Sequence, residues 1–118
     1  MSLLEANALT ALLNAAERNH ALIANNLANV NTPGYRTQRL AFARQLDDLL
    51  DVRGRLLPGS RIETRAERPM YRDVSADGND VSLEREIVEL NVNALRMQLY
   101  LEVLGNRIRK LRMAIEGR

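Results

Sequence analysis

Apolar residues in the last third of the chain recur in alternating steps of four and three residues, from residue 83 to residue 115. This heptad spacing predicts one long helix with an apolar stripe along it, as in coiled coils. Ser82 is placed to cap the helix, Glu84 and Glu86 suit its first turn, and Gly117 suits its end. Cations between residues 107 and 112 favour the same polarity. The stripe consists of Leu83, Ile87, Leu90, Ala94, Met97, Leu101, Leu104, Ile108, Leu111 and Ile115.

A second apolar stripe accompanies the first on this helix. It consists of Val88, Val92, Leu95, Leu99 and Val103. One partner helix cannot cover both stripes, and the chain has too few other helices to bury them in a compact bundle. The surplus apolar surface therefore predicts packing against neighbouring chains, with a monomeric bundle as the alternative.

The N-terminal region predicts a second long helix, from about residue 2 to residue 30. Ser2 and Glu5 have the spacing of a capping box. The single histidine, His20, lies on the predicted stripe, where we expect a register residue rather than a catalyst. The stripe consists of Leu9, Leu13, Ala16, His20, Ile23, Leu27 and Val30.

The predicted fold is mainly all-α: two long terminal helices form an antiparallel, coiled-coil-like pair joined by a middle segment. We divide the chain into an N-terminal helical part (1–32), a middle segment (33–81) and a C-terminal helix (82–118). Apolar spacing allows a short helix at 40–52. The rest of the middle segment is predicted to be loop, with a turn at "ADGN" and room for short strands at 61–64 and 70–74.

Composition argues against most kinds of chemistry. The 118-residue chain has no cysteine and no second histidine, so it offers no thiolate or paired-histidine metal site, and no Ser/His/Asp arrangement is evident around His20. "DGNDVSLE" lacks the alternating ligands of a calcium loop, and no Gly-rich phosphate loop is present. We therefore expect no enzyme activity, metal or cofactor. The net charge is only +2 and aromatics are 3%, so we expect no nucleic-acid binding. No apolar run is long enough to insert into a membrane.

The stretch "NNLANVNTPGY", residues 25–35, stops the first helix and carries more asparagines than a stop needs. Pro33 and Gly34 favour a tight turn, and Tyr35 can pack back on the helix end. Asn26 and Asn29 flank stripe residues, so we expect their amides to bond to a neighbouring helix and fix its register.

This stretch resembles the N-terminal signature of the flagellar axial proteins, the family of rod, hook and hook-associated proteins. The matching positions are Asn26, Leu27, Ala28, Asn29, Thr32, Gly34 and Tyr35, with Pro33 between them. Asn25 stands near a position where many members carry serine. The C-terminal heptad helix is the family's second hallmark. The short chain and "DGNDVSLEREIVELNVNALRMQLYLEVLGNRI" resemble the proximal rod members most.

The resemblance implies a structural subunit that packs helically, through its terminal helices, into the drive shaft of the flagellar basal body. It implies export by the flagellar type III system without a cleaved signal peptide, and assembly in the periplasm. The implied partners are further copies, other rod proteins, and the adaptor and export gate at the rod base. The alternatives are another rod subunit, or a soluble coiled-coil adaptor or regulator.

Overall fold

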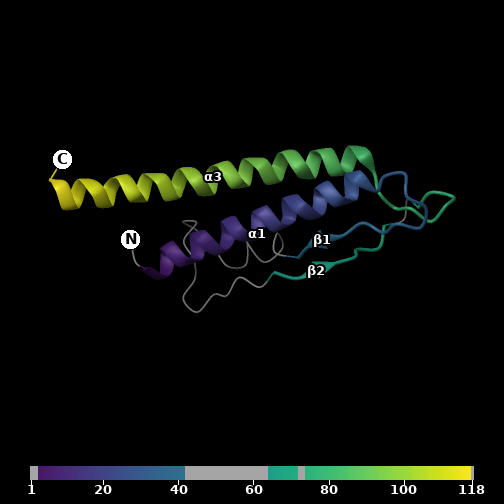
Figure 1. The fold of residues 1–118 in the computed structure, drawn as a ribbon, viewed down its shortest axis with the longest axis horizontal. Helices are drawn as coiled ribbons and strands as arrows, with labels where there is room; N and C mark the ends of the chain where they lie inside the picture. Colours follow the sequence, from purple (N-terminus) through teal and green to yellow (C-terminus); the bar gives the residue numbers. More distant parts are fainter. Residues whose placement is uncertain (1–2, 42–63, 72–73, 118) are drawn as a thin grey trace.

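Two helices and one pair of short strands make up the part of the chain that the structure describes. A computed structural model describes residues 3–41, 64–71 and 74–117, with side chains from residue 9 onward. The elements are α1 (Leu3–Ala28), β1 (Arg39–Leu40), β2 (Ala66–Glu67) and α3 (Leu83–Glu116). The molecule is elongated, with extents of 64 × 27 × 19 Å (Figure 1).

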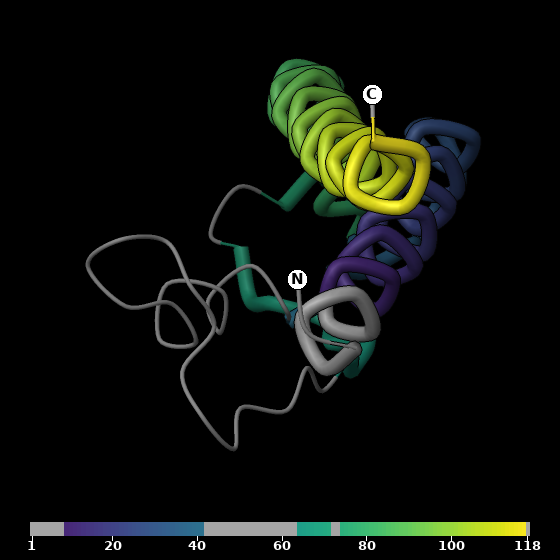
Figure 2. The backbone as a smooth tube through the Cα atoms, turned by 90° about the vertical axis from the view of Figure 1, so that its left-hand side faces the viewer, coloured from purple at the N-terminus to yellow at the C-terminus, as the bar shows by residue number. Residues whose placement is uncertain are grey.

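Helices α1 and α3 lie side by side and run in opposite directions, so that both chain termini lie at one end of the molecule (Figures 1 and 2). The connection between them turns at the other end. Helix α3 is the longer, with 34 residues against 26, and it extends beyond the start of α1 (Figure 1). The predicted pair of long antiparallel helices is confirmed.

The ends of α3 follow the local signals in the sequence. The Ser82 side chain accepts a hydrogen bond from the Arg85 backbone N–H, as an N-cap does. Gly117 ends the helix in the left-handed region, at φ 69°, and its N–H donates to the Met113 carbonyl. The four cations at 107–112 stop short of the last turn, which contains no basic residue. Since the dipole effect fades within one turn, the expected charge–dipole match is realised only at the start of α3.

The face of α1 that packs against α3 differs from the predicted stripe. Its buried residues are Leu12, Ala15, Ala16, Asn19, Ile23 and Asn26. Only Ala16 and Ile23 belong to the predicted stripe, and His20 is exposed, which corrects its placement in the interface. Two small alanines allow close approach here, and the two asparagines find polar partners on α3, so this face is preferred over the more apolar one.

The face of α3 that packs against α1 is largely polar. Its buried positions recur every seven residues: Glu86, Asn93 and Tyr100. Tyr100 joins Leu12, Ala15, Ala16 and Leu40 in a small core. Most of the predicted apolar stripe therefore points away from α1.

In the middle segment, β1 and β2 pair antiparallel, with Arg39 opposite Glu67 and Leu40 opposite Ala66. Strand β2 falls between the two strands expected at 61–64 and 70–74. The described residues of those two segments, including Thr64, Met70 and Tyr71, are not in a strand. Residues 61–63 and 72–73 lie outside the described residues. Leu40, expected to begin a short helix, is a strand residue because its side chain is buried in the core while its backbone joins the ladder. The remainder of that helix, 42–52, and the proposed Ser2–Glu5 cap lie outside the part of the structure that can be described.

Candidate assembly site

The turn after α1 has the conformation that its sequence predicts. Helix α1 ends at Ala28, two residues before the predicted end, and hydrogen-bonded turns follow. Gly34 adopts φ 72°, which favours glycine, and its N–H donates to the Asp77 carbonyl at 2.9 Å. The "ADGN" turn also forms, with Gly78 at φ 85° and its N–H bonded to Ser75. The two turns are therefore joined backbone to backbone.

Asn26 is fully buried and uses both ends of its amide. Its Nδ2 donates to the Gln38 carbonyl at 2.8 Å and to Glu86 Oε2 at 3.1 Å. Its Oδ1 accepts from the Tyr35 hydroxyl and from the Gln38 N–H, each at 3.0 Å. This one side chain connects α1 to the segment after the turn and to the first turn of α3.

The other asparagines of the signature stay within their own helix end. Asn29 Nδ2 donates to the Asn25 carbonyl at 2.8 Å, and its Oδ1 accepts from the Thr32 hydroxyl at 3.0 Å. Asn25 Nδ2 donates to the Tyr35 hydroxyl at 3.0 Å. Of the two amides expected to reach a neighbouring helix, only Asn26 does so, and the helix is α3 of the same chain.

Asn79, which sequence reasoning missed, binds the turn that follows α1. Its Nδ2 lies within 3.2 Å of three carbonyl oxygens, those of Asn29, Val30 and Thr32. Its Oδ1 accepts from the Val81 N–H at 2.8 Å. These carbonyls belong to the turn that follows α1. Those of Asn29 and Thr32 also accept from the backbone N–H groups of Thr32 and Tyr35, so the Asn79 amide adds a distant donor that holds this turn in place. The only local signal was the turn "ADGN" itself.

Asp80, the next residue, binds the segment that follows the turn after α1. Its Oδ1 accepts from the backbone N–H of Thr37 at 2.6 Å and from the Thr37 hydroxyl at 2.9 Å. Its Oδ2 forms an ion pair with Arg36 at 2.9 Å. Burial by itself would raise the pKa of the Asp80 carboxyl, but these bonds outweigh it and hold that pKa below its ordinary value.

Glu86 places a second fully buried carboxylate between the two helices. Its Oε1 forms an ion pair with Arg39 Nη2 at 2.8 Å. Arg39 Nε also donates to the Tyr71 hydroxyl at 2.8 Å, and the Arg85 guanidinium lies 3.5 Å from the centre of the Tyr71 ring. A buried charge is tolerated only when it is paired and hydrogen-bonded, and both conditions are met here.

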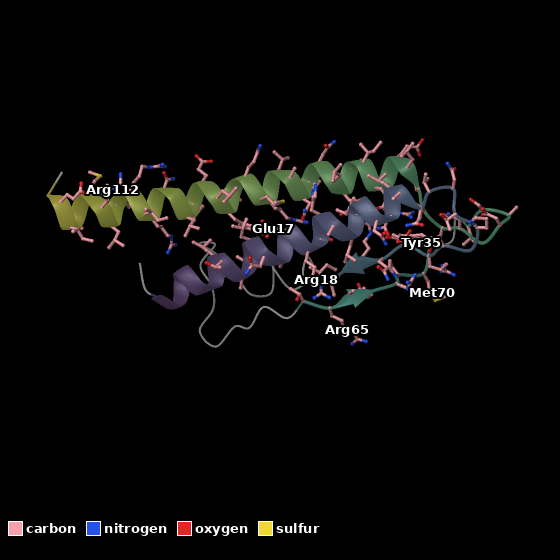
Figure 3. All side chains as sticks on the ribbon, viewed as in Figure 1. Glu17, Arg18, Tyr35, Arg65, Met70 and Arg112 are labelled. Carbon is pink, nitrogen blue, oxygen red and sulfur yellow. The ribbon has the colours of Figure 1, made fainter. Side chains whose placement is uncertain are left out.

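We call this region the joint, defined as residues 25–40, Tyr71 and residues 75–86. Figure 3 places Tyr35 at the end of the molecule where the chain turns between the helices. Further along the pair, Asn19 Nδ2 donates to Asn93 Oδ1 at 3.0 Å, and Asn93 Nδ2 donates to the Ala16 carbonyl at 2.8 Å. Buried amides that satisfy one another fix the register of paired helices, because any slip leaves them unpaired.

The predicted stripe residues fall into three groups by exposure. Exposed are Leu83, Ile87, Leu101, Ile108, Leu111 and Ile115; half-buried are Leu9, Leu13, Leu27, Leu90, Met97 and Leu104; buried is Ile23. The C-terminal stripe thus lies at the edge of the intramolecular interface, with most of its members exposed. We call this side of α3 the first flank.

The second stripe forms an apolar flank of its own. Leu95 is 66% exposed and Leu99 is 56% exposed, and Val88 and Val92 are also exposed. At roughly 100° per residue, this second flank lies on the opposite side of α3 from the first. Exposed polar residues, including Asn91 and Gln98, separate the two on the outer side. Helix α3 therefore presents two apolar surfaces that face away from each other.

Neither a metal site nor a membrane helix is found in the described parts of the chain. Residues 3–41, 64–71 and 74–117 contain no cluster of three or more His, Cys, Asp or Glu side chains suited to a metal ion. No helix within those ranges is both long and apolar enough to cross a bilayer. The features left to explain are the joint and the two flanks.

Comparisons with known proteins show which family the chain resembles. Residues 6–36, which include the first part of the joint, match the family described as "Flagella basal body rod protein". The chain is 30% identical over 122 residues to the flagellar basal body rod protein FlgB of Salmonella typhimurium, across 89% of this chain and 88% of that protein. It is 34% identical over 110 residues to FlgB of Cereibacter sphaeroides, across 86% and 85%. It is 25% identical over 113 residues to FlgB of Bacillus subtilis, across 89% and 88%.

Proposed function

The chain belongs to the flagellar basal body rod protein family, and we propose that it builds the proximal part of the rod by helical polymerisation through its two terminal helices. It is a structural subunit of the rod. In this proposal, the two flanks of α3 are the surfaces that hold neighbouring subunits together, and the finished tube transmits torque.

The observation that carries this proposal is the outward placement of the apolar residues of α3. Leu95, Leu99 and Leu101 are each more than half exposed, although they lie in the middle of a 34-residue helix. Burying an exposed side chain of this size in a contact contributes about 1.5–3 kcal/mol at most. A flank with several such residues is therefore sufficient to hold a neighbouring subunit.

Two different flanks on opposite sides of one helix also suit an open assembly. When a surface binds a different surface on the next copy, the contact repeats without closing on itself and produces a helical array. A single apolar stripe would instead suit a closed pair of subunits.

The joint supports this role by fixing the helix pair before assembly. Asn26, Asn79 and Glu86 each connect α1 or its end to distant parts of the chain, so the flanks are presented in one defined geometry. A pre-organised surface loses less conformational entropy on binding than a mobile one.

Partners and route are further parts of the proposal. Family membership places the subunit in the basal body rod, and we infer contacts with other rod proteins, the rod-base adaptor and the flagellar export gate. Passage through the flagellar type III system, without a cleaved signal peptide, would deliver it to the periplasm. Catalysis is not part of the proposal, because the buried polar groups described above are engaged mainly with one another.

The flanks can be tested by placing a charge on each. Leu99→Asp and Leu101→Asp should each abolish motility and rod assembly in cells whose own copy of the gene is deleted, because a carboxylate cannot be buried unpaired in an apolar contact. Gln98→Asp is the matched control, because it is exposed on the same helix outside both flanks. The measurements are swimming halos and rods counted in isolated basal bodies.

Normal motility in both flank variants, with expression equal to the control, would contradict the proposal. Localisation separates the alternatives. A chain recovered far from the rod base would be another rod subunit. A chain that stays in the cytoplasm whether export is active or blocked would be an adaptor or regulator.

A further inference from the structure

The "ADGN" turn of the joint contains a reactive pair of residues. Asp77 is the one aspartate in the sequence that glycine follows, and it is exposed. An aspartate carboxyl can react with the backbone nitrogen of the next residue, and glycine hinders this attack least because it has no side chain. The turn favours glycine at this place, since Gly78 adopts φ 85°. The fold therefore keeps a reactive sequence at an accessible position.

The reaction lengthens the backbone by one atom. The Gly78 nitrogen bonds to the Asp77 Cγ, and a carboxyl oxygen leaves as water with its own proton and the amide proton. Water then adds to the main-chain carbonyl carbon of Asp77 and breaks its bond to the Gly78 nitrogen. In the product, isoaspartate, the chain continues through Cβ and Cγ of residue 77. One water is lost and one is gained, nothing is oxidised, and residue 77 keeps one carboxylate.

In the folded chain, hydrogen bonds hold both reacting groups. The Gly78 N–H donates to the Ser75 carbonyl at 2.9 Å, and Asp77 Oδ1 accepts from the Asn79 N–H at 3.1 Å. The Asp77 carbonyl also accepts from the Gly34 N–H at 2.9 Å. Cyclisation brings Cγ onto the Gly78 nitrogen and removes the proton of that nitrogen, so the first two bonds must break before the reaction can proceed.

The turn cannot open alone, because the two residues after it are anchored in the joint. Asn79 and Asp80 are both buried, and they bind the turn after α1 and the Thr37 backbone. The reverse also holds. An extra backbone atom at residue 77 would displace both anchors relative to the segment that they bind. Isoaspartate at this position and a closed joint therefore exclude each other.

We propose that Asp77 is a site of spontaneous isoaspartate formation, and that the joint sets its rate: slow once the joint has closed, and fast while the chain is unfolded. The reactive pair and the hydrogen bonds that hold its reacting groups carry this inference. It goes beyond the proposed function, because it concerns the chain before it becomes a subunit. A chain that is modified while unfolded would not close the joint.

Ageing of the full-length protein tests the protection. Wild-type protein is kept warm at neutral pH for several weeks, either folded or unfolded in guanidinium chloride. Isoaspartate at residue 77 is quantified by electron-transfer mass spectrometry, which distinguishes the two isomers by their fragments. We expect about tenfold less product in the folded sample, because reaction there requires a local opening. Equal yields in the two samples would overturn the proposal.

Two variants connect the protection to the joint. Asn79→Ala removes an anchor but keeps the reactive pair, so its folded yield should rise toward its unfolded yield. Asn31→Ala is the matched control, because Asn31 is exposed in the turn that Asn79 contacts. Each variant is compared with its own unfolded sample, which corrects for a changed neighbour. Equally low folded yields in both variants would contradict control by the joint.

Circular dichroism first establishes that Asn79→Ala folds. If it does not, Arg36→Gln takes its place, since it weakens the Asp80 anchor from the surface and should also raise the folded yield.

The modified chain tests the reverse effect. Chains with isoaspartate at residue 77 are separated from unmodified chains of the same unfolded sample, and both are refolded. The modified chain should unfold at a lower denaturant concentration, because its joint cannot close. Both chains carry the same charge, so the difference reports the backbone. Equal midpoints would overturn this part of the proposal. Neither result depends on the flank variants, so failure of the proposed function would remain distinguishable.

Discussion

The first turn of α3 lies inside a network of hydrogen bonds, whereas the last turns of the same helix, residues 108–117, are entirely exposed. At the joint, most polar atoms have a named partner and most contacts are specific to one geometry. In residues 108–117 and along the flanks, large apolar side chains are exposed. Polar contacts therefore define the geometry of the subunit, and its exposed apolar surfaces are the ones that we propose for contacts with neighbours.

The largest effect should come from Glu86, the buried carboxylate of the joint. Glu86→Ala leaves Arg39 without its buried partner and removes one of the two acceptors of the Asn26 amide, so we expect a loss of about 3–5 kcal/mol in the free energy of unfolding. Urea denaturation of the purified monomer, followed by circular dichroism, measures this. Glu84→Ala is the control, because its side chain is exposed in the same turn. Equal midpoints for the two variants would show that the joint does not hold the helix pair together.

A smaller effect is expected at Asn79, which holds the turn after α1 from a distant position in the sequence. Asn79→Ala removes the side-chain donor of the Asn29, Val30 and Thr32 carbonyls, of which Asn29 and Thr32 keep backbone donors, and the cost should be about 1–3 kcal/mol. Asn31→Ala is the comparison, since Asn31 is exposed in the turn that Asn79 contacts. Faster amide hydrogen exchange confined to residues 29–35 would locate the effect, and unchanged exchange there would argue against the role of Asn79.

The smallest effect concerns Tyr100, whose buried hydroxyl has no hydrogen-bond partner among the residues that the structure describes. Tyr100→Phe should change the free energy of unfolding by less than about 1 kcal/mol, because no bond is lost. Burial raises the pKa of the Tyr100 phenol above its ordinary value of 10.0. The neutral phenol is favoured in the folded state, so its contribution is intact below pH 10 and is lost as pH rises through the folded pKa.

Denaturation at alkaline pH measures this contribution. Stability should fall more steeply above pH 10 in the wild type than in Tyr100→Phe. Tyr35→Phe serves as a contrast, because the Tyr35 hydroxyl donates to Asn26 and its loss should cost stability at neutral pH as well. Identical alkaline slopes for the wild type and Tyr100→Phe would contradict the burial of this phenol.

Local signals were predicted well from the sequence because their causes are local. The Ser82 cap, the Gly117 end and the Pro33–Gly34 turn depend on neighbouring residues alone. The two long helices followed from apolar spacing over many turns. The inward face of each helix was harder to predict. Apolar stripes were expected in the interface, whereas Asn93 and Glu86 are buried there and several leucines of α3 are exposed.

The joint could be predicted only in part. Asn26 stood out through its motif, but its partners at Gln38 and Glu86 depend on how distant segments fold together. Asn79 carried no signal beyond a turn, since its role exists only when residues 29–32 are brought beside it. The same reason explains Leu40, whose pairing with Ala66 cannot be read from either segment alone.

The short ladder of β1 and β2 holds together the two ends of the segment between them. The chain leaves the helix pair at Ala41 and returns at Arg65, and these two residues are joined by a backbone hydrogen bond of 2.9 Å. The two ends of the intervening segment, at Ala41 and Arg65, are therefore neighbours. Lengthening such an excursion costs only about 0.6 kcal/mol for each doubling of its length. Evolution can thus enlarge or replace what lies between these residues while the helix pair keeps its geometry.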